Sequence, residues 1–506
     1  METFLDDWGL TLAVFLPLAG ALVLLLVPRS DEGTAKLVAL VTTLLTGAVG
    51  VGLLAFFDYD SGGMQFERTE RWIPVINANY EIGVDGISLP LLVLSMFVSI
   101  LVVVYSWNHW PEPRNPKAFL VLLLILEVGM NGTFVAQDLI LFFVFFEVVL
   151  LPMYFMIGVW GGEQRQYAAI KFFLFTLFGS ALMILSFLAL YFLGGETFSI
   201  PRLVEVAQDN IHPDTALWIF AGLFMGFAIK VPMFPFHTWL PDAHTQAPTQ
   251  GSVILAAILL KLGTYGFVRI ALPILPEAAQ SWAPWIGLLA VIGIIYGALG
   301  CLAQTDMKRL IAFSSVAHMG FVMLGIATMT PLGINAAIFG MVAHGWITGM
   351  LFFVAGSVKD RFHTLEMSRL GGLLLQAPKL GWILGFCAMA SLGLPGLAGF
   401  WGEFPAILAA YQPAEGLSVE VFRVYMVVAA IGTVFAAGYL LWMLQRAAFG
   451  TPKEEFANEH IHDLHTEEWI AWAPLLAAIV VFGLFPRLLF DITDPAVRTV
   501  LGAMGG

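Results

Sequence analysis

The sequence predicts an all-α membrane protein that crosses the bilayer about fourteen times. Of its 506 residues, 59% are hydrophobic and only 12% are charged, whereas a soluble protein has roughly 45–50% apolar and about 25% charged residues. Apolar stretches long enough to span a bilayer, about 20 residues each, recur along the whole chain. The polar links between them are too short for a soluble domain. The composition therefore excludes a soluble enzyme and a disordered chain.

Charge and cysteine content exclude two further classes. The chain holds 36 acidic and 23 basic residues, a balance that argues against contacts with nucleic-acid phosphates. Cys301 and Cys387 are the two cysteines and lie far apart in apolar stretches. Two thiols cannot hold an iron–sulfur cluster or a four-cysteine zinc site alone. A disulfide between them stays open at this point, although no spacing favours one.

The predicted spans follow one another closely, with edges uncertain by a few residues. They run approximately over 8–28, 35–57, 86–107, 117–136, 138–160, 167–194, 215–235, 247–272, 282–304, 307–329, 332–357, 379–411, 422–449 and 468–489.

We interpret the whole chain, 1–506, as one membrane domain with an internal repeat. Helices 4–8 and helices 9–13 each form a set of five in which the fourth helix is interrupted, and an odd number of spans inverts the second copy. The predicted parts are helices 1–3 in 1–116, the first repeat in 117–272, the second repeat in 282–449, and helix 14 in 468–489.

The distribution of charge predicts the orientation. Asp6 and Asp7 precede the first apolar run and Arg29 follows it, which is the reverse of a signal peptide. The odd-numbered connections hold 14 Lys and Arg residues, and the even-numbered connections with the C-terminal tail hold 7. The positive-inside rule therefore places both termini outside.

Two links are long enough to carry structure of their own. The link 58–85, external in this orientation, contains Arg71–Gly83, which is able to form a short hairpin. The cytoplasmic link 450–467 is polar and holds three histidines. A metal site there is an open alternative, but a solvated loop is favoured because no cysteine supports the metal. The histidines are His460, His462 and His465.

Seven predicted spans carry an ionisable side chain, although each such group costs about 3 kcal/mol or more near the bilayer centre. Interhelical ion pairs would explain one or two of them. Seven groups on seven helices favour a proton path, because buried acids, amines and imidazoles can exchange protons near neutral pH. A neutral hydrogen-bonded state is an alternative for the histidines, and close packing at Gly129 and Gly132 is an equal alternative for the first group. The groups are Glu127, Glu147, Lys230, Lys261, His318, His344 and Glu403.

Prolines and glycines interrupt helices 7 and 12. Each break removes backbone hydrogen bonds and lies beside a buried charge, a lysine in helix 7 and a glutamate in helix 12. Interruptions at corresponding positions of two repeats are typical of ion sites in transporters. Prolines also occur in membrane helices without such a role. The residues at the breaks are Pro232, Pro235, Pro395 and Gly396.

Three stretches carry a family resemblance that extends over nearly the whole chain. Ala228–Gly266, Gln304–Gly320 and Phe142–Met156 resemble the antiporter-like membrane subunits of respiratory complex I. Subunits L and N of that family carry a lysine in helix 12, and L adds a long lateral helix. The glutamate at Glu403 and the chain length resemble subunit M, called chain 4 in the mitochondrial enzyme.

The resemblance implies roles for the buried groups. Glu147 and Lys230 would form a gating ion pair, Lys261 would be the central site, and Glu403 the terminal one. The two histidines, His318 and His344, would continue a hydrated axis from the central site to the terminal one. The resemblance also covers the loop after helix 7, where we expect side chains to cap the freed backbone ends. A metal site in this loop is a weak alternative without a fourth ligand. The loop residues are His237, Asp242 and His244.

The resemblance further implies a proton-translocating subunit of NADH:quinone oxidoreductase in the bacterial plasma membrane. Electron transfer would occur in partner subunits, which would hold FMN, iron–sulfur clusters and quinone, and this chain would hold none. Subunits L and N would lie on either side, with lipids around them. Two alternatives keep the fold, namely a multi-subunit sodium/proton antiporter and a membrane-bound hydrogenase. A structural spacer is a third, disfavoured by the buried lysines.

Overall fold

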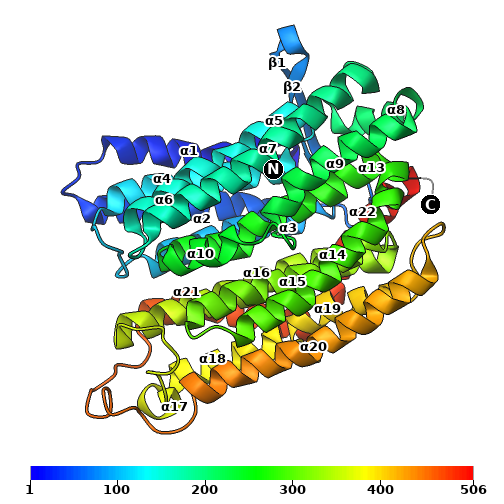
Figure 1. Cartoon of the computed structure of the whole chain (residues 1–506). Coiled ribbons are helices and arrows are strands. Elements are labelled where there is room, and N and C mark those ends of the chain that lie inside the picture. Colours follow the sequence, from blue (N-terminus) through cyan, green and yellow to red (C-terminus); the bar gives the residue numbers. More distant parts are fainter. Residues whose placement is uncertain (1, 505–506) are drawn as a thin grey trace.

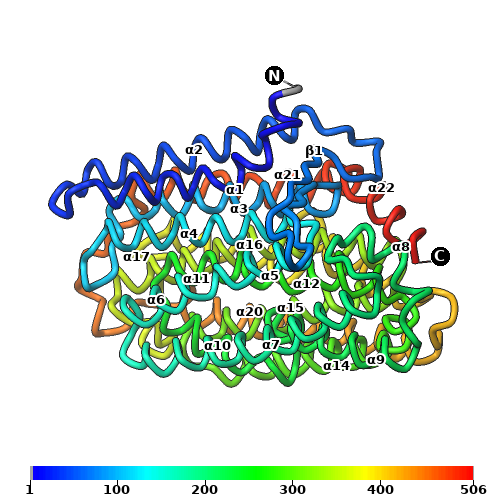
Figure 2. Tube along the Cα trace, turned by 90° about the horizontal axis from the view of Figure 1, so that it is seen from above, coloured from blue at the N-terminus to red at the C-terminus, as the bar shows by residue number. Residues whose placement is uncertain are grey.

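A computed structural model describes residues 2–504, in which twelve helical segments are long and apolar enough to cross a membrane. They lie side by side in one elongated bundle, with α1 and α2 along one edge (Figures 1 and 2). This confirms the predicted all-α polytopic fold. The segments are α1 (Glu2–Leu26), α2 (Glu32–Phe56), α3 (Ser88–Tyr105), α4 (Pro116–Val135), α5 and α6 (Leu139–Val148 and Leu150–Trp160), α7 (Arg165–Gly194), Thr249–Ile274, α14 (Pro276–Leu302), α15 (Met307–Ala327), α16 (Pro331–Phe362), α20 (Val419–Ala447) and α21 (Thr466–Leu484).

The other two predicted spans consist of shorter helices separated by turns. Helix α9 (Pro213–Lys230) stops at the buried lysine, and α10 (Trp239–Gln246) begins nine residues later. Helix α18 (Pro378–Ser391) is likewise followed, after turns, by α19 (Ala398–Ala409). The total of fourteen crossings and the two inverted repeats stay predictions.

A two-stranded antiparallel hairpin projects from one end of the bundle (Figure 1). Strand β1 (Gln65–Ile73) pairs with β2 (Ala78–Val84), and the short helix η1 (Pro74–Ile76) connects them. The hairpin is longer than the predicted 71–83, because its first strand begins at Gln65. Backbone hydrogen bonds anchor it to the bundle, since the Gln137 N–H donates to the Glu81 carbonyl at 2.8 Å.

Two short amphipathic helices were not predicted from the sequence. Helices α8 (Ile200–Asn210) and α22 (Arg487–Ala503) bury one face and expose the other, and they lie at the same end of the bundle in Figure 1. Helix α17 (Leu373–Gln376) lies at the opposite end. Their polar faces keep their mean hydropathy low, so a search for apolar runs of bilayer length does not find them.

Two buried ion pairs tie distant segments together. Arg269 donates to Asp85 at 2.5 Å, and Arg361 donates to both carboxylate oxygens of Glu468, at 3.0 and 2.7 Å. Each pair joins a helix to a segment more than 100 residues away in the sequence. The cysteines form no disulfide, because Cys301 and Cys387 are both free and buried.

Glu81 gives the hairpin a pH dependence. Burial, with smaller contributions from Asp138 and Glu67, raises the pKa of Glu81 to about 7, although the Ser199 hydroxyl donates to its carboxylate at 3.0 Å. A detached hairpin would ionise near the ordinary value of 4.5. Between these two values the docked hairpin binds more protons, so its docking weakens as the pH rises.

We therefore expect Glu81→Gln to strengthen hairpin docking at alkaline pH. The gain should be about 1 kcal/mol at about pH 8 and close to zero at about pH 5, after a discount for the partial exposure of Glu81. Hydrogen-exchange protection of the amides in 65–84 would measure it. Glu70→Gln, on the exposed part of the paired strand, is the control. Equal protection of the wild type at both pH values would contradict the prediction.

Candidate proton-transfer site

Lys261 lies at the centre of the buried polar groups. Its segment comprises α11 (Thr249–Ile254), the π-helix η2 (Leu255–Leu259), α12 (Leu260–Gly266), a second π-helix η3 (Phe267–Ala271) and α13 (Leu272–Ile274). The side chain is fully buried, and Nζ donates to the Ala256 carbonyl and lies 2.7 Å from His344 Nδ1. An ammonium group only donates. When Lys261 is protonated, Nδ1 of a neutral His344 is therefore the acceptor and Nε2 carries the proton.

A second cluster forms where helix 12 is interrupted. His318 Nδ1, on α15, lies 2.6 Å from Glu403 Oε1 on α19. Nε2 of the same ring lies 3.0 Å from the Ser391 hydroxyl, at the end of α18, and 3.1 Å from the Tyr439 hydroxyl, on α20. The chain turns at Gly393 with a φ of +78°, a conformation that favours glycine. The break thus places a serine and a glutamate against one imidazole.

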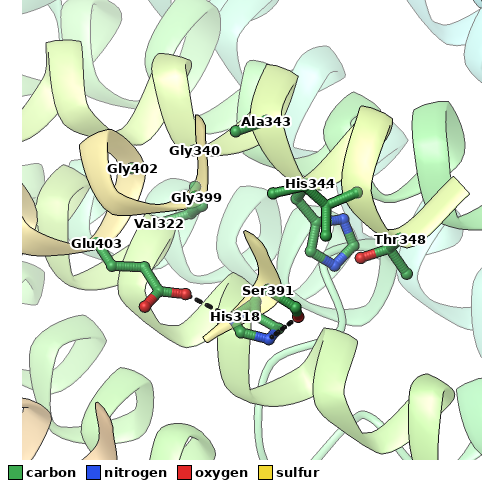
Figure 3. A pocket seen from close by; sticks show the side chains of 11 residues that line it. His318, Val322, Gly340, Ala343, His344, Thr348, Ser391, Gly399, Gly402 and Glu403 are labelled. Carbon is green, nitrogen blue, oxygen red and sulfur yellow. Dashed lines mark hydrogen bonds and ion pairs between the residues drawn. The ribbon is translucent and has the colours of Figure 1, made fainter. Parts of the chain in front are cut away.

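A small cavity separates the two clusters. Its volume is about 30 Å³, and its lining includes His318, His344, Thr348, Ser391 and Glu403 (Figure 3). The two imidazole rings are 6.1 Å apart between centroids. A water molecule needs roughly 10–15 Å³ measured in this way, so the cavity has room for one or two. Among the described residues, His344 Nε2 has no hydrogen-bond partner, so it can donate to such a water.

Glu147 and Lys230 do not form the predicted ion pair in this structure. The Glu147 carboxylate accepts a hydrogen bond from the Ser180 hydroxyl, and Lys230 Nζ lies 4.8 Å above the Phe146 ring. Among the described residues, the ion pairs within 4.0 Å do not join the two side chains. The serine hydroxyl satisfies the carboxylate, and the aromatic face attracts the ammonium group by a cation–π interaction.

Lys230 nevertheless lies beside the helix that carries Lys261. Helix α12 approaches α9 at Gly263, where an added Cβ would lie 2.7 Å from the Phe227 carbonyl and 3.1 Å from Lys230 Cβ. Only glycine allows this approach without a shift of the backbone. A movement of α9 at its C-terminus would therefore be transmitted to the segment of Lys261.

The expected capping by the loop after α9 is wrong for Asp242. Its carboxylate pairs with Lys171 Nζ at 2.7 Å and with an Arg309 nitrogen at 3.5 Å. The indole N–H of Trp239 instead donates to the Ile229 carbonyl at 2.9 Å, next to the end of α9. The tryptophan was not expected as a cap because short polar side chains are the usual ones, but a buried indole N–H also needs a partner.

The two histidines of this loop have different surroundings. His237 stacks on Phe234 with ring centroids 5.7 Å apart, and His244 stacks on Phe352 at 4.5 Å. Among the described residues, neither ring nitrogen of His244 has a hydrogen-bond partner. Among the described residues, 237, 242 and 244 form no metal-binding group, and the His244 ring nitrogens remain without a hydrogen-bond partner.

A large polar cavity opens at the end of the bundle that carries most of the basic residues. Its volume is about 520 Å³, and its lining includes His109, Gln250, Lys308, Lys359 and Asp360. Gln250 donates to the His109 carbonyl at 2.6 Å, and Lys308 Nζ donates to the Ala247 carbonyl at 2.5 Å. We call this cavity the vestibule. Lys308 is not among the buried groups that the sequence predicts, because it precedes the apolar part of α15.

Comparison with known families gives two adjoining matches. Residues 136–431 match the family described as NADH:quinone oxidoreductase/Mrp antiporter, and residues 66–133 match the amino terminus of NADH-ubiquinone oxidoreductase chain 4. The NADH-quinone oxidoreductase subunit M of Rhodobacter capsulatus is 42% identical over 96% of this chain and 95% of its own length. The subunit M of Rickettsia conorii is 39% identical over 97% and 98%.

Solved structures show the same fold. A chain of respiratory complex I from Thermus thermophilus superposes with a TM-score of 0.87 at 30% identity, covering 98% of this chain and all of that chain. A chain of the Mrp complex from Dietzia is similar in fold, with a TM-score of 0.85 at 20% identity, covering 99% and 100%.

Proposed function

The chain belongs to the family of NADH-quinone oxidoreductase subunit M, and from this premise we propose how its buried side chains carry protons. It is a proton-translocating, multi-pass membrane subunit of NADH:quinone oxidoreductase in a bacterial plasma membrane, and other subunits of that complex are its partners. Our proposal places FMN, the iron–sulfur clusters and quinone in those partners. It also places subunits L and N on either side, lipids around the bundle, and both termini outside.

The observation that carries the proposal is the chain of contacts from Lys261 to Glu403. Lys261 contacts His344, His344 faces the small cavity, and His318 on the other side of the cavity contacts Glu403. Each member can take up and release a proton, and one or two waters in the cavity would bridge the 6.1 Å between the rings. A proton can therefore pass from Lys261 to Glu403 by short steps.

We place proton uptake at the vestibule. It is open and polar, and Lys308 in its wall donates to the Ala247 carbonyl, three residues after His244. His244, with both ring nitrogens unpartnered, would pass protons from the vestibule toward Lys261. This role replaces the structural one that the sequence argument favoured for His244.

Glu147 and Lys230 would control whether Lys261 is protonated, rather than carry the proton themselves. When Glu147 exchanges its Ser180 hydrogen bond for an ion pair with Lys230, the charge of Lys230 is stabilised and acts less on Lys261. When the pair is open, two like charges on packed helices oppose each other, which favours release of the Lys261 proton. The close contact of α9 and α12 at Gly263 supports this coupling.

His344→Gln tests the path at its middle. Glutamine can accept the Lys261 hydrogen bond but cannot shuttle a proton, so we expect NADH-driven proton uptake by inverted vesicles to fall about tenfold or more. A native gel would show that the complex is assembled. His460→Gln, at an exposed loop histidine, is the matched control. Full pumping by an assembled His344→Gln enzyme would overturn the proposed path.

A further inference from the structure

Glu127 is a buried carboxyl group that the proposed path does not use. It lies on α4 with a side chain that is fully buried, and neither carboxyl oxygen has a hydrogen-bond partner among the described residues. Ser99, on α3, is also buried, and its hydroxyl has no partner within the described chain either. Buried polar groups are nearly always hydrogen-bonded to protein or to ordered water. Two unpartnered groups on neighbouring helices therefore need an explanation.

The helix register places the two groups together. Helices α3 and α4 are consecutive spans, and the Ser95 hydroxyl on α3 donates to Asn131 Oδ1 on α4 at 2.7 Å. Ser99 follows Ser95 by one turn, and Glu127 precedes Asn131 by one turn. Because consecutive spans run in opposite directions, these steps lead to the same level of the interface and the same face of each helix. The next layer after the Ser95–Asn131 pair is thus Ser99 with Glu127.

The chemistry of this layer favours a neutral acid and a water molecule. Among the described residues, no cation lies within 4.0 Å of Glu127, and an unpaired buried carboxylate is very costly. A metal cation would need about six oxygen ligands, whereas this layer offers three. One bridging water both donates and accepts. It therefore satisfies a protonated carboxyl and a hydroxyl that do not reach each other.

The layer lies close to the level of Lys261. Tyr265 donates to the Phe134 carbonyl on α4 at 3.0 Å, so these two residues mark a common level. The two segments run in the same direction, because the end of α4 pairs with the hairpin and α13 contacts α8 at the same end of the bundle. Glu127 precedes Phe134 by two turns, and Lys261 precedes Tyr265 by one. Glu127 thus lies about 5 Å along the axis from the level of Lys261.

We propose that Glu127 and Ser99 form a buried site for one water molecule, in which Glu127 is the neutral acid. The site stores a proton outside the Lys261–Glu403 axis. It lies about one helical turn along the bundle from the level of Lys261. The water site stands on the two unpartnered groups and their register, and it does not depend on the proposed path.

Infrared spectra of the purified complex at neutral pH, compared between wild type and each variant, test the site. We expect a carbonyl band of a protonated carboxyl group that is lost in Glu127→Gln. Replacement of Ser99 by alanine weakens the hold on the water, so the band should move to higher frequency in Ser99→Ala. Ser106→Ala is the matched control, because Ser106 lies on the same buried helix end and donates to the Val102 carbonyl at 2.8 Å. The Glu127 band should not move in Ser106→Ala.

Two results would overturn the proposal. Identical spectra of wild type and Glu127→Gln would mean that Glu127 is ionised. A Glu127 band that is the same in wild type and Ser99→Ala would mean that the carboxyl shares no water with Ser99. If the Glu127→Gln complex fails to assemble, the comparison of wild type with Ser99→Ala and Ser106→Ala still decides, because a shift specific to residue 99 requires a protonated carboxyl beside it.

Discussion

Lys261→Met is expected to abolish NADH-driven proton uptake by inverted membrane vesicles while the complex still assembles. Methionine fills the buried volume with a flexible apolar chain, so packing is largely kept. It removes the ammonium group that donates to both the Ala256 carbonyl and His344 Nδ1. Loss of a positioned proton carrier costs roughly 10²–10⁴ in rate, and coupled NADH–quinone turnover should fall with pumping.

A second substitution separates charge from proton exchange at this position. Arginine keeps a cation but does not release its proton in proteins, so Lys261→Arg should also lose pumping if Lys261 carries the proton. Pumping retained in Lys261→Arg would assign the lysine a purely electrostatic role. Pumping retained in Lys261→Met would remove it from the path. Lys379→Met, at an exposed position that begins α18, controls for the loss of a lysine.

Glu403→Gln is expected to have a similarly large effect at the other end of the path. Glutamine keeps the size of the side chain and can still hydrogen-bond to His318, but it cannot take up the proton that His318 releases. We expect proton uptake to fall about 10²-fold, measured in the same vesicles with native gels for assembly. Glu403→Asp should keep part of the activity, because it shortens the side chain without removing the acid.

Glu420→Gln provides the control for this prediction, since Glu420 is exposed at the start of α20. Wild-type pumping in an assembled Glu403→Gln enzyme would show that the proton leaves His318 by another route. The Tyr439 hydroxyl, 3.1 Å from His318 Nε2, would then be the next candidate, and Tyr439→Phe would test it.

The sequence predicts the bundle well because its physical signals are local. An apolar run of bilayer length and the charge inside it are visible in any window of about 20 residues. Lys261 and Glu403 stand out for this reason. The partners of these groups come from other helices and do not stand out in the sequence. Ser391 and Tyr439 carry hydroxyls, which are common in membrane helices. Their contacts with His318 depend on how α15, α18 and α20 pack.

The same reason explains where the structure differs from the expected contacts. The expected Glu147–Lys230 pair assumed that opposite charges meet, but Ser180, on a third helix, takes the carboxylate instead. The unpartnered state of Glu127 cannot be predicted from its own helix, since close packing at Gly129 and Gly132 was an equally good reading. Both glycines do pack closely, against Val149 and Phe145 of the next span, and the buried acid is present as well.

The wide turns beside Lys261 have a consequence for how this segment tolerates changes in length. A π-turn holds one more residue than an α-turn and bonds residue i to i+5. Removing one residue from Leu255–Leu259 would therefore restore an ordinary α-helix and leave the flanking faces in place. The Ala256 carbonyl lies in this turn and accepts from Lys261 Nζ, so we expect such a deletion to take this acceptor away from Lys261. The wide turn thus bears on the hydrogen bonding of Lys261 as well as on helix packing.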